Sequence, residues 1–130
     1  MLLYDYPLLQ FGFPTDMQAQ MMAILTTAKG MSIVEETVFE SRNKHISELI
    51  RVGANIVLLH DGMTSVINGV KKLQGTTVTC KDLRGGAALI LAGLAAEGKT
   101  IVANSAFVKR GYVDIEDDLR KIGADIWHTE

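Results

Sequence analysis

Two stretches of the chain carry apolar residues at helical spacing. They are Met17, Met21, Ile24, Leu25 and Ala28 in the first stretch, and Leu83, Ala87, Ile90, Leu91 and Leu94 in the second. The spacing of i, i+4, i+7, i+8 and i+11 places each set on one face of an α-helix. An aspartate precedes each stretch and a glycine follows it, as expected for an N-cap and for a left-handed residue at a helix end. The pattern therefore predicts two helices, capped by Asp16 and Asp82 and closed by Gly30 and Gly98.

The segments that come after these two helices also correspond. MSIVEETVF comes after the first helix and KTIVANSAF after the second, and both are typical of strands. A polar loop and a second helix come next, where ELIRVGANI at 48–56 matches DLRKIGADI at 118–126. IVLLHDGMTSVING then predicts a hairpin with Asp61–Gly62 as its turn. The chain thus consists of almost two β-α-β-α-β-β units, over 1–75 and 76–130, the second without its last strand.

This repeat predicts the fold class, because an internal repeat determines architecture before any local pattern does. One unit is too small to bury two helices and a sheet, so we expect an α/β fold in which the copies pack around a shared axis with the helices inside. AALILAGLAA is apolar nearly all round and should lie at the centre. Residues 89–96 would still expose apolar surface, which we expect another copy or a missing segment to cover.

Composition narrows the choice of partners. The chain has 130 residues and a formal charge of −2, with its lysines and arginines scattered, so we expect neither nucleic acid nor an anionic membrane as a partner. The opening MLLYDYPLLQ carries an aspartate and is too short for a membrane span, which favours a cytosolic protein. Cys80 is the only cysteine and is expected to be a buried apolar residue. The three histidines lie far apart, so no metal and no cofactor is predicted.

Charged residues recur at matching positions of the two units. Arg42 and Arg110 both lie in the loop between the inner strand and the second helix, and rotation-related units would bring such loops to one end of the domain. Arg84 comes two residues into the second-unit helix, whose positive end also favours an anion. Together these arginines predict a phosphate or carboxylate site, although a single exposed arginine is usually only a solvated charge. Asp16 is compatible with both a cap and a catalytic carboxylate, whereas Asp82 is interpreted as a cap alone.

Several motifs together resemble one enzyme family. GFPTDMQAQ, ETVFESR, DLRGGAALILAGLAAEG, RGY and LRKIGADI follow one another in the order and near the spacing found in the later part of UDP-N-acetylglucosamine 1-carboxyvinyltransferases. The resemblance implies an inside-out α/β barrel of β-α-β-α-β-β units. It also implies transfer of the enolpyruvyl group of phosphoenolpyruvate to the 3-hydroxyl of UDP-N-acetylglucosamine, the first committed step of bacterial peptidoglycan synthesis.

The resemblance also implies roles for individual residues. Asp16 matches the aspartate that contacts the sugar hydroxyl and takes its proton, and neighbouring positive charge would keep its carboxylate ionised. Val38 and Phe39 match the segment that lines the UDP-sugar site. The arginines that match those holding the phosphate and carboxylate of phosphoenolpyruvate are Arg42, Arg84 and Arg110.

The chain departs from the family pattern at a few places. The near-N-terminal lysine and asparagine and the reactive cysteine of the other domain have no counterpart, and Gly85–Gly86 follow Arg84. Glycine at a helix start costs about 1 kcal/mol relative to alanine. Three interpretations remain open: part of a longer transferase, a short relative that assembles with itself or another chain, or a scaffold without activity. A shikimate-type enolpyruvyl transferase is a further alternative.

Overall fold

The structure is a computed structural model that describes residues 2–4, 17–35, 44–60, 62–109, 111–112 and 114–127. The elements of residues 1–75 come in the predicted order, β-α-β-α-β-β: β1 (Leu2–Tyr4), α1 (Gln18–Leu25), β2 (Met31–Glu35), α2 (Ile46–Arg51), β3 (Asn55–Leu59) and β4 (Thr64–Asn68). The later part holds β5 (Thr77–Thr79), α3 (Leu83–Ala95), β6 (Ile101–Ala103), α4 (Ala106–Lys109) and α5 (Ile115–Lys121). The unit boundaries at 75 and 76 stay a prediction.

Both parts of the chain contain a parallel β-α-β arrangement. β1 pairs with β2 and β5 pairs with β6, each in parallel, with a helix between the paired strands. β2 also pairs antiparallel with β4, and β4 with β3, which gives a four-stranded sheet in the order β1-β2-β4-β3. The predicted hairpin is therefore present. Its loop is longer than predicted, because the last paired residues are Leu59 and Thr64 and residues 60–63 lie between them.

The two predicted caps differ in the structure. Asp82 precedes α3, and its Oδ1 accepts a hydrogen bond from the backbone N–H of Gly85 at 2.6 Å, as predicted. The N-cap position of α1 falls on Met17, one residue later than predicted, and no described side chain caps it. Asp16 itself lies outside the described residues.

Glycine ends α2 and α5 in the same way. After α2, the N–H of Gly53 donates to Ile50 O at 2.9 Å and the next N–H donates to Leu49 O at 3.1 Å, with φ of +99° at Gly53. Gly123 has φ of +101° and ends α5 with the same pair of bonds. Both are Schellman motifs, which favour glycine at C′. Gly30 and Gly98 also have positive φ, but they lie beyond the helix ends at Leu25 and Ala95 rather than directly at them.

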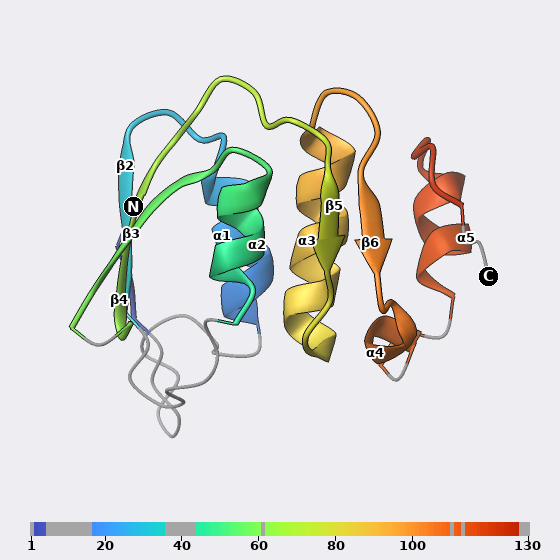
Figure 1. Cartoon of the computed structure of the whole chain (residues 1–130), viewed down its shortest axis with the longest axis horizontal. Helices are drawn as coiled ribbons and strands as arrows, with labels where there is room; N and C mark the ends of the chain where they lie inside the picture. The colour runs from blue at the N-terminus through green and yellow to red at the C-terminus, as the bar shows by residue number, and fades with distance from the viewer. Residues whose placement is uncertain are drawn as a thin grey trace.

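Helix α3 lies at the centre, as predicted for the AALILAGLAA segment. Figure 1 shows the four-stranded sheet at one side, α1 and α2 against it, α3 next to them, and β5 and β6 beyond. The main core contains fully buried residues from both parts of the chain, including Met22, Leu49, Ile67, Leu73 and Leu89. A smaller cluster of Cys80, Ile90 and Val108 joins α3 to α4.

Much of residues 89–96 is covered by this chain itself. Leu89, Ile90 and Ala92 are buried, while Leu94 is 39% exposed. The apolar surface left on α3 is therefore smaller than the sequence led us to expect. Within the described ranges, no helix is both long and apolar enough to cross a bilayer.

Candidate functional site

The described residues include one of the six predicted site residues. Arg84 is the second residue of α3 and is half-buried, two positions after the cap Asp82. The other five, Asp16, Val38, Phe39, Arg42 and Arg110, lie outside the described residues. The candidate site therefore consists of Arg84 and of the described residues that lie near the other five in the sequence.

The helices next to the predicted residues in the sequence begin at the same end of the molecule. In Figure 1 the N-terminal ends of α1, α2, α3 and α4 all lie at the lower end. The Nε2 of Gln20 in α1 donates to the hydroxyl oxygen of Tyr112 at 3.2 Å, across 92 positions of sequence. Gly111 lies so close to α3 that a Cβ there would be 2.6 Å from Leu83 Cδ2. The first turns of α1 and α3 and the segment after α4 thus meet.

Two glycines allow close packing at the start of α3. A Cβ at Gly85 would lie 2.7 Å from Asp82 Oδ1 and 3.0 Å from His45 Cβ. A Cβ at Gly86 would overlap Cys80 Sγ and lie 2.6 Å from Val108 Cγ2. The sequence suggested only a loosened helix, whereas the structure shows that β5, α2 and α4 approach α3 through these two positions.

His45 is buried where α2 meets the start of α3. It is 2% exposed, and neither ring nitrogen has a hydrogen-bond partner among the described residues. Burial lowers the pKa of His45 to about 4, although the charge of Asp82 acts in the opposite direction. The imidazole is therefore neutral at pH 7. The sequence offered no signal for this beyond a histidine one residue before an apolar helix.

Cys80 is the buried apolar residue that the sequence predicted. It is fully buried at the end of β5, and its Sγ donates to Asp82 O at 3.1 Å. Burial raises the pKa of its thiol, which keeps it protonated and unreactive. Among the described residues, no three His, Cys, Asp or Glu side chains gather as a metal site would require.

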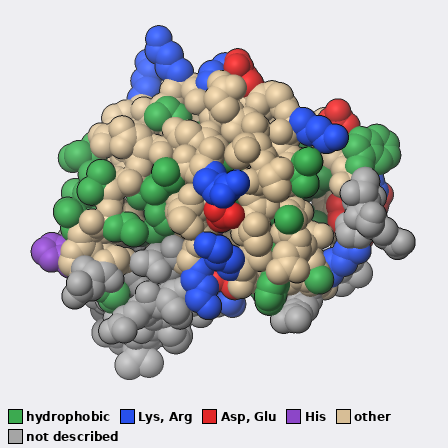
Figure 2. Space-filling view, in the orientation of Figure 1, with side chains coloured by type: hydrophobic (Ala, Val, Ile, Leu, Met, Phe, Trp, Pro, Cys, Tyr) green, Lys and Arg blue, Asp and Glu red, His purple; other side chains and the backbone are tan. Residues whose placement is uncertain are grey.

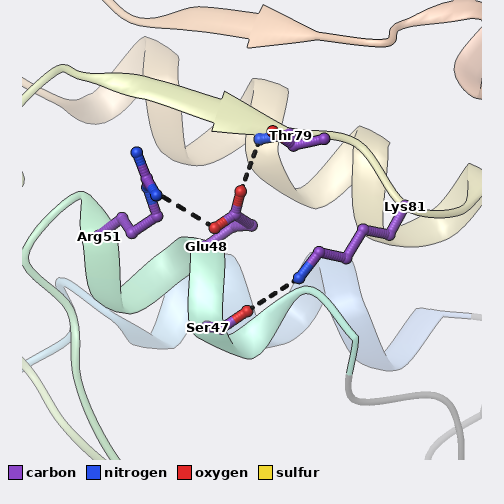
Figure 3. Close-up of polar contacts among 5 residues, drawn as sticks. All are labelled: Ser47, Glu48, Arg51, Thr79 and Lys81. Atoms are coloured by element: carbon purple, nitrogen blue, oxygen red, sulfur yellow. Dashed lines mark hydrogen bonds and ion pairs between the residues drawn. The ribbon is translucent and has the colours of Figure 1, made fainter.

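A buried carboxylate joins the two parts of the chain, and sequence reasoning missed it (Figure 3). Glu48 in α2 is 6% exposed, and its Oε1 accepts the backbone N–H of Thr79 in β5 at 2.7 Å. Its Oε2 lies 3.7 Å from Arg51 Nε. Lys81 Nζ also donates a hydrogen bond to Ser47 Oγ at 3.2 Å. These contacts hold α2 against the strand that leads into α3, and so fix the start of α3 relative to α2.

The surface carries its charges in separate groups. On the face drawn in Figure 2, several Lys and Arg side chains lie near the centre and others lie at the edges, and some are beside Asp or Glu. Lys72 pairs with Glu97 at 3.5 Å and Lys121 pairs with Asp117 at 3.0 Å. Hydrophobic side chains gather on the side of the four-stranded sheet, where Val57, Leu58 and Leu59 of the edge strand β3 are 43–50% exposed.

Comparison with known proteins gives consistent matches. A family model described as EPSP synthase (3-phosphoshikimate 1-carboxyvinyltransferase) matches residues 7–119. The chain is 56% identical over 116 residues to UDP-N-acetylglucosamine 1-carboxyvinyltransferase 1 of Caldanaerobacter subterraneus subsp. tengcongensis, which covers 89% of this chain and 28% of the relative. It is 51% identical over 118 residues to UDP-N-acetylglucosamine 1-carboxyvinyltransferase of Desulfofundulus thermocisternus, covering 91% of this chain and 48% of the relative.

Solved structures give similar results. The enolpyruvyl transferase NikO from Streptomyces tendae matches with a TM-score of 0.86 and 31% identity, over 98% of this chain and 29% of that one. EPSP synthase from Acinetobacter baumannii matches with a TM-score of 0.66 and 22% identity, over 88% of this chain and 27% of that one, a likeness of fold alone. The chain thus spans between about a quarter and a half of the length of these relatives.

Proposed function

The chain belongs to the EPSP synthase (3-phosphoshikimate 1-carboxyvinyltransferase) family, and on that premise we propose that it forms part of an enolpyruvyl transferase that acts on UDP-N-acetylglucosamine. In the proposed reaction the 3-hydroxyl oxygen of the sugar bonds to C2 of phosphoenolpyruvate. The bond from C2 to the phosphate oxygen breaks, and the hydroxyl proton leaves with the phosphate. The reaction involves no change of oxidation state, so no redox cofactor is needed.

The choice of acceptor sugar rests on sequence identity. Relatives named UDP-N-acetylglucosamine 1-carboxyvinyltransferase are 50–56% identical to this chain, whereas EPSP synthase from Acinetobacter baumannii is 22% identical. This difference favours UDP-N-acetylglucosamine over shikimate 3-phosphate as the acceptor. Peptidoglycan synthesis, and the cytoplasm where both substrates are made, are part of the same proposal.

The contacts between described residues carry the proposal for the site. Gln20 follows Asp16 by four residues, Leu83 precedes Arg84, and Gly111 follows Arg110. Gln20 contacts Tyr112, and Gly111 packs on Leu83, so three segments bearing proposed site residues converge. A base and an anion site that lie close together would serve both substrates of the proposed reaction.

We assign the roles as the motifs suggest. Asp16 would take the proton from the sugar hydroxyl, and Val38 and Phe39 would line the UDP-sugar site. The phosphate and carboxylate of phosphoenolpyruvate would be held by Arg42, Arg84 and Arg110. Guanidinium groups suit both anions because their N–H donors match two oxygens at once.

A chimera tests the function directly. The matched segment of the Caldanaerobacter subterraneus relative is replaced by this chain, and phosphate release from phosphoenolpyruvate and UDP-N-acetylglucosamine is measured. We expect turnover that Asp16→Asn lowers by 10² or more, as loss of a general base does. Arg84→Met should raise KM for phosphoenolpyruvate more than KM for the sugar. A folded chimera that binds neither substrate would contradict the proposal.

The chain by itself is expected not to turn over. Positioning of reactants can lower the barrier by roughly 7–11 kcal/mol. This chain matches only 28% and 48% of two relatives, so it supplies only part of the residues that could position the substrates. Sustained phosphate release by the purified chain, abolished by Asp16→Ala, would show instead that self-association rebuilds a working site. The scaffold alternative predicts no binding of either substrate by the chain or the chimera.

A further inference from the structure

One polar contact joins the two parts of the chain next to proposed site residues. Gln20 lies in the first turn of α1, and its side-chain amide donates to the Tyr112 hydroxyl at 3.2 Å. The residue is only 7% exposed, and its Oε1 finds no hydrogen-bond partner in the part of the chain that the structure describes. Glutamine is rarely buried without being fully paired, because an unpaired buried amide oxygen costs free energy. This residue therefore has a reason to be glutamine other than packing.

The backbone at Tyr112 is held to α4, although the residue is 36% exposed. Its backbone N–H and that of Gly111 both donate to Val108 O, at 3.0 and 3.2 Å. Val108 is 1% exposed and belongs to the cluster that joins α3 to α4. Gly111 packs against Leu83 at the start of α3. The Gln20 amide thus supplies the described link from this segment to α1.

We propose that Gln20 and Tyr112 are positioning residues, which hold the segment after α4 at a fixed place relative to the start of α1. This inference rests on the proposed function, in which Asp16 acts on the sugar hydroxyl and Arg110 on phosphoenolpyruvate. Gln20 follows Asp16 by four residues, and Tyr112 follows Arg110 by two. The contact fixes Gln20 and Tyr112, which lie near these two residues in the sequence, relative to each other, and neither needs to touch a substrate.

Three variants separate positioning from stability. Tyr112→Phe removes the hydroxyl and leaves the Gln20 amide buried without an acceptor, so it should destabilise the chain. Gln20→Met removes the amide and keeps the length of the side chain. In the double variant no buried donor is left unpaired, so stability should return toward that of the unchanged chain. The segment after α4 should not regain its place relative to α1, because the hydrogen bond between Gln20 and Tyr112 is absent in all three variants.

Amide hydrogen exchange in the 130-residue chain measures that position without any substrate. We expect exchange of the Gly111 and Tyr112 amides to become about tenfold faster in Tyr112→Phe and in the double variant, while the amides of β4 are unchanged. Lys121→Ala breaks an exposed ion pair in α5 and serves as the control, with no effect at 111–112. Unchanged exchange at 111–112 in the double variant would overturn the inference, whatever its stability.

Kinetics of the chimera give the second measurement. We expect the double variant to raise KM for phosphoenolpyruvate about fivefold or more and to change KM for UDP-N-acetylglucosamine less than twofold. A merely structural contact would lower the amount of active enzyme and leave both KM values unchanged, and that result would also overturn the inference. If the unchanged chimera binds neither substrate while the exchange rates shift as expected, the proposed function fails and the positioning of the segment stands.

Discussion

Helices α2 and α5 have matching sequences but very different burial. ELIRVGANI contains residues 48–51 of α2 and DLRKIGADI contains residues 118–121 of α5, and both helices end in the same Schellman motif. Yet α2 buries Ile46, Glu48 and Leu49, whereas α5 buries none of its residues. Val52 is 2% exposed, and Ile122 at the corresponding position is 80% exposed.

The difference arises from the segments that pack on each helix. After α2 the chain makes the hairpin of β3 and β4 and then returns, so that the N–H of Gln74 donates to Val52 O at 2.8 Å and Leu73 is fully buried in the core. No described segment covers α5 in this way. Local sequence therefore determines the helix and its end, and the neighbouring segments determine how much the helix contributes to stability.

The largest difference in the free energy of unfolding is expected between two leucine-to-alanine substitutions. Leu49→Ala should lower the free energy of unfolding by about 2–5 kcal/mol, because it leaves a cavity at a fully buried site. Leu119→Ala, at the corresponding position of α5, should cost roughly 1 kcal/mol because its side chain is only partly buried. Urea unfolding followed by circular dichroism measures both. Equal losses would contradict the comparison.

Glu48 and Asp118 occupy corresponding positions of α2 and α5, and their substitutions should give the next largest difference in the free energy of unfolding. Glu48→Met removes the buried acceptor of the Thr79 N–H, and it should cost about 1.5–3 kcal/mol, as hydrogen bonds to charged groups do. Glu48→Gln keeps an acceptor oxygen and should cost less. Asp118→Asn, at the exposed position of α5, should stay within about 0.5 kcal/mol. If Asp118→Asn were as costly as Glu48→Met, the hydrogen bond from Thr79 in β5 to Glu48 in α2 would not explain the loss of stability.

His45 makes the first unit sensitive to pH, and Ile115 stands at the corresponding position of the second. The unfolded chain takes a proton on His45 below about pH 6.5, while burial keeps the folded one neutral down to about pH 4. Stability should therefore fall as the pH drops from 6.5 toward 4, by roughly 2 kcal/mol between pH 7 and pH 5, with no contribution from His45 above that range. Unfolding of the unchanged chain and of His45→Ile at both pH values measures this. A pH dependence that survives in His45→Ile would have another origin.

The smallest effect is expected at the exposed end of α5. Ile122→Thr should change the free energy of unfolding by no more than about 0.5 kcal/mol, because the side chain is already in water. Val52→Thr places a hydroxyl in the core at the corresponding position and should cost more than about 1 kcal/mol. A large loss from Ile122→Thr in the 130-residue chain would show that another copy covers α5, and sedimentation at several concentrations would detect that copy.

Much of the fold could be predicted from the sequence. Helical spacing predicted both helix pairs, and alternation around Asp61–Gly62 predicted the hairpin, because these features depend on neighbours within a few residues. The ends predicted at Gly30 and Gly98 were wrong, because α1 ends at Leu25 and α3 at Ala95. The cap at Asp82 was predicted for the same reason. The start of α1 was predicted one residue too early, an error of the size that helix boundaries commonly show.

The candidate site could be predicted only as a set of residue types. Motifs and repeat positions selected Asp16 and the arginines, but the link between Gln20 and Tyr112 spans 92 positions and obeys no local pattern. The same holds for Glu48 and Thr79, and for the overlap that keeps position 86 a glycine beside Cys80. Periodicity within one segment reports which face of a helix is apolar. Only the tertiary structure decides which distant segment covers that face, since that depends on how the units pack together.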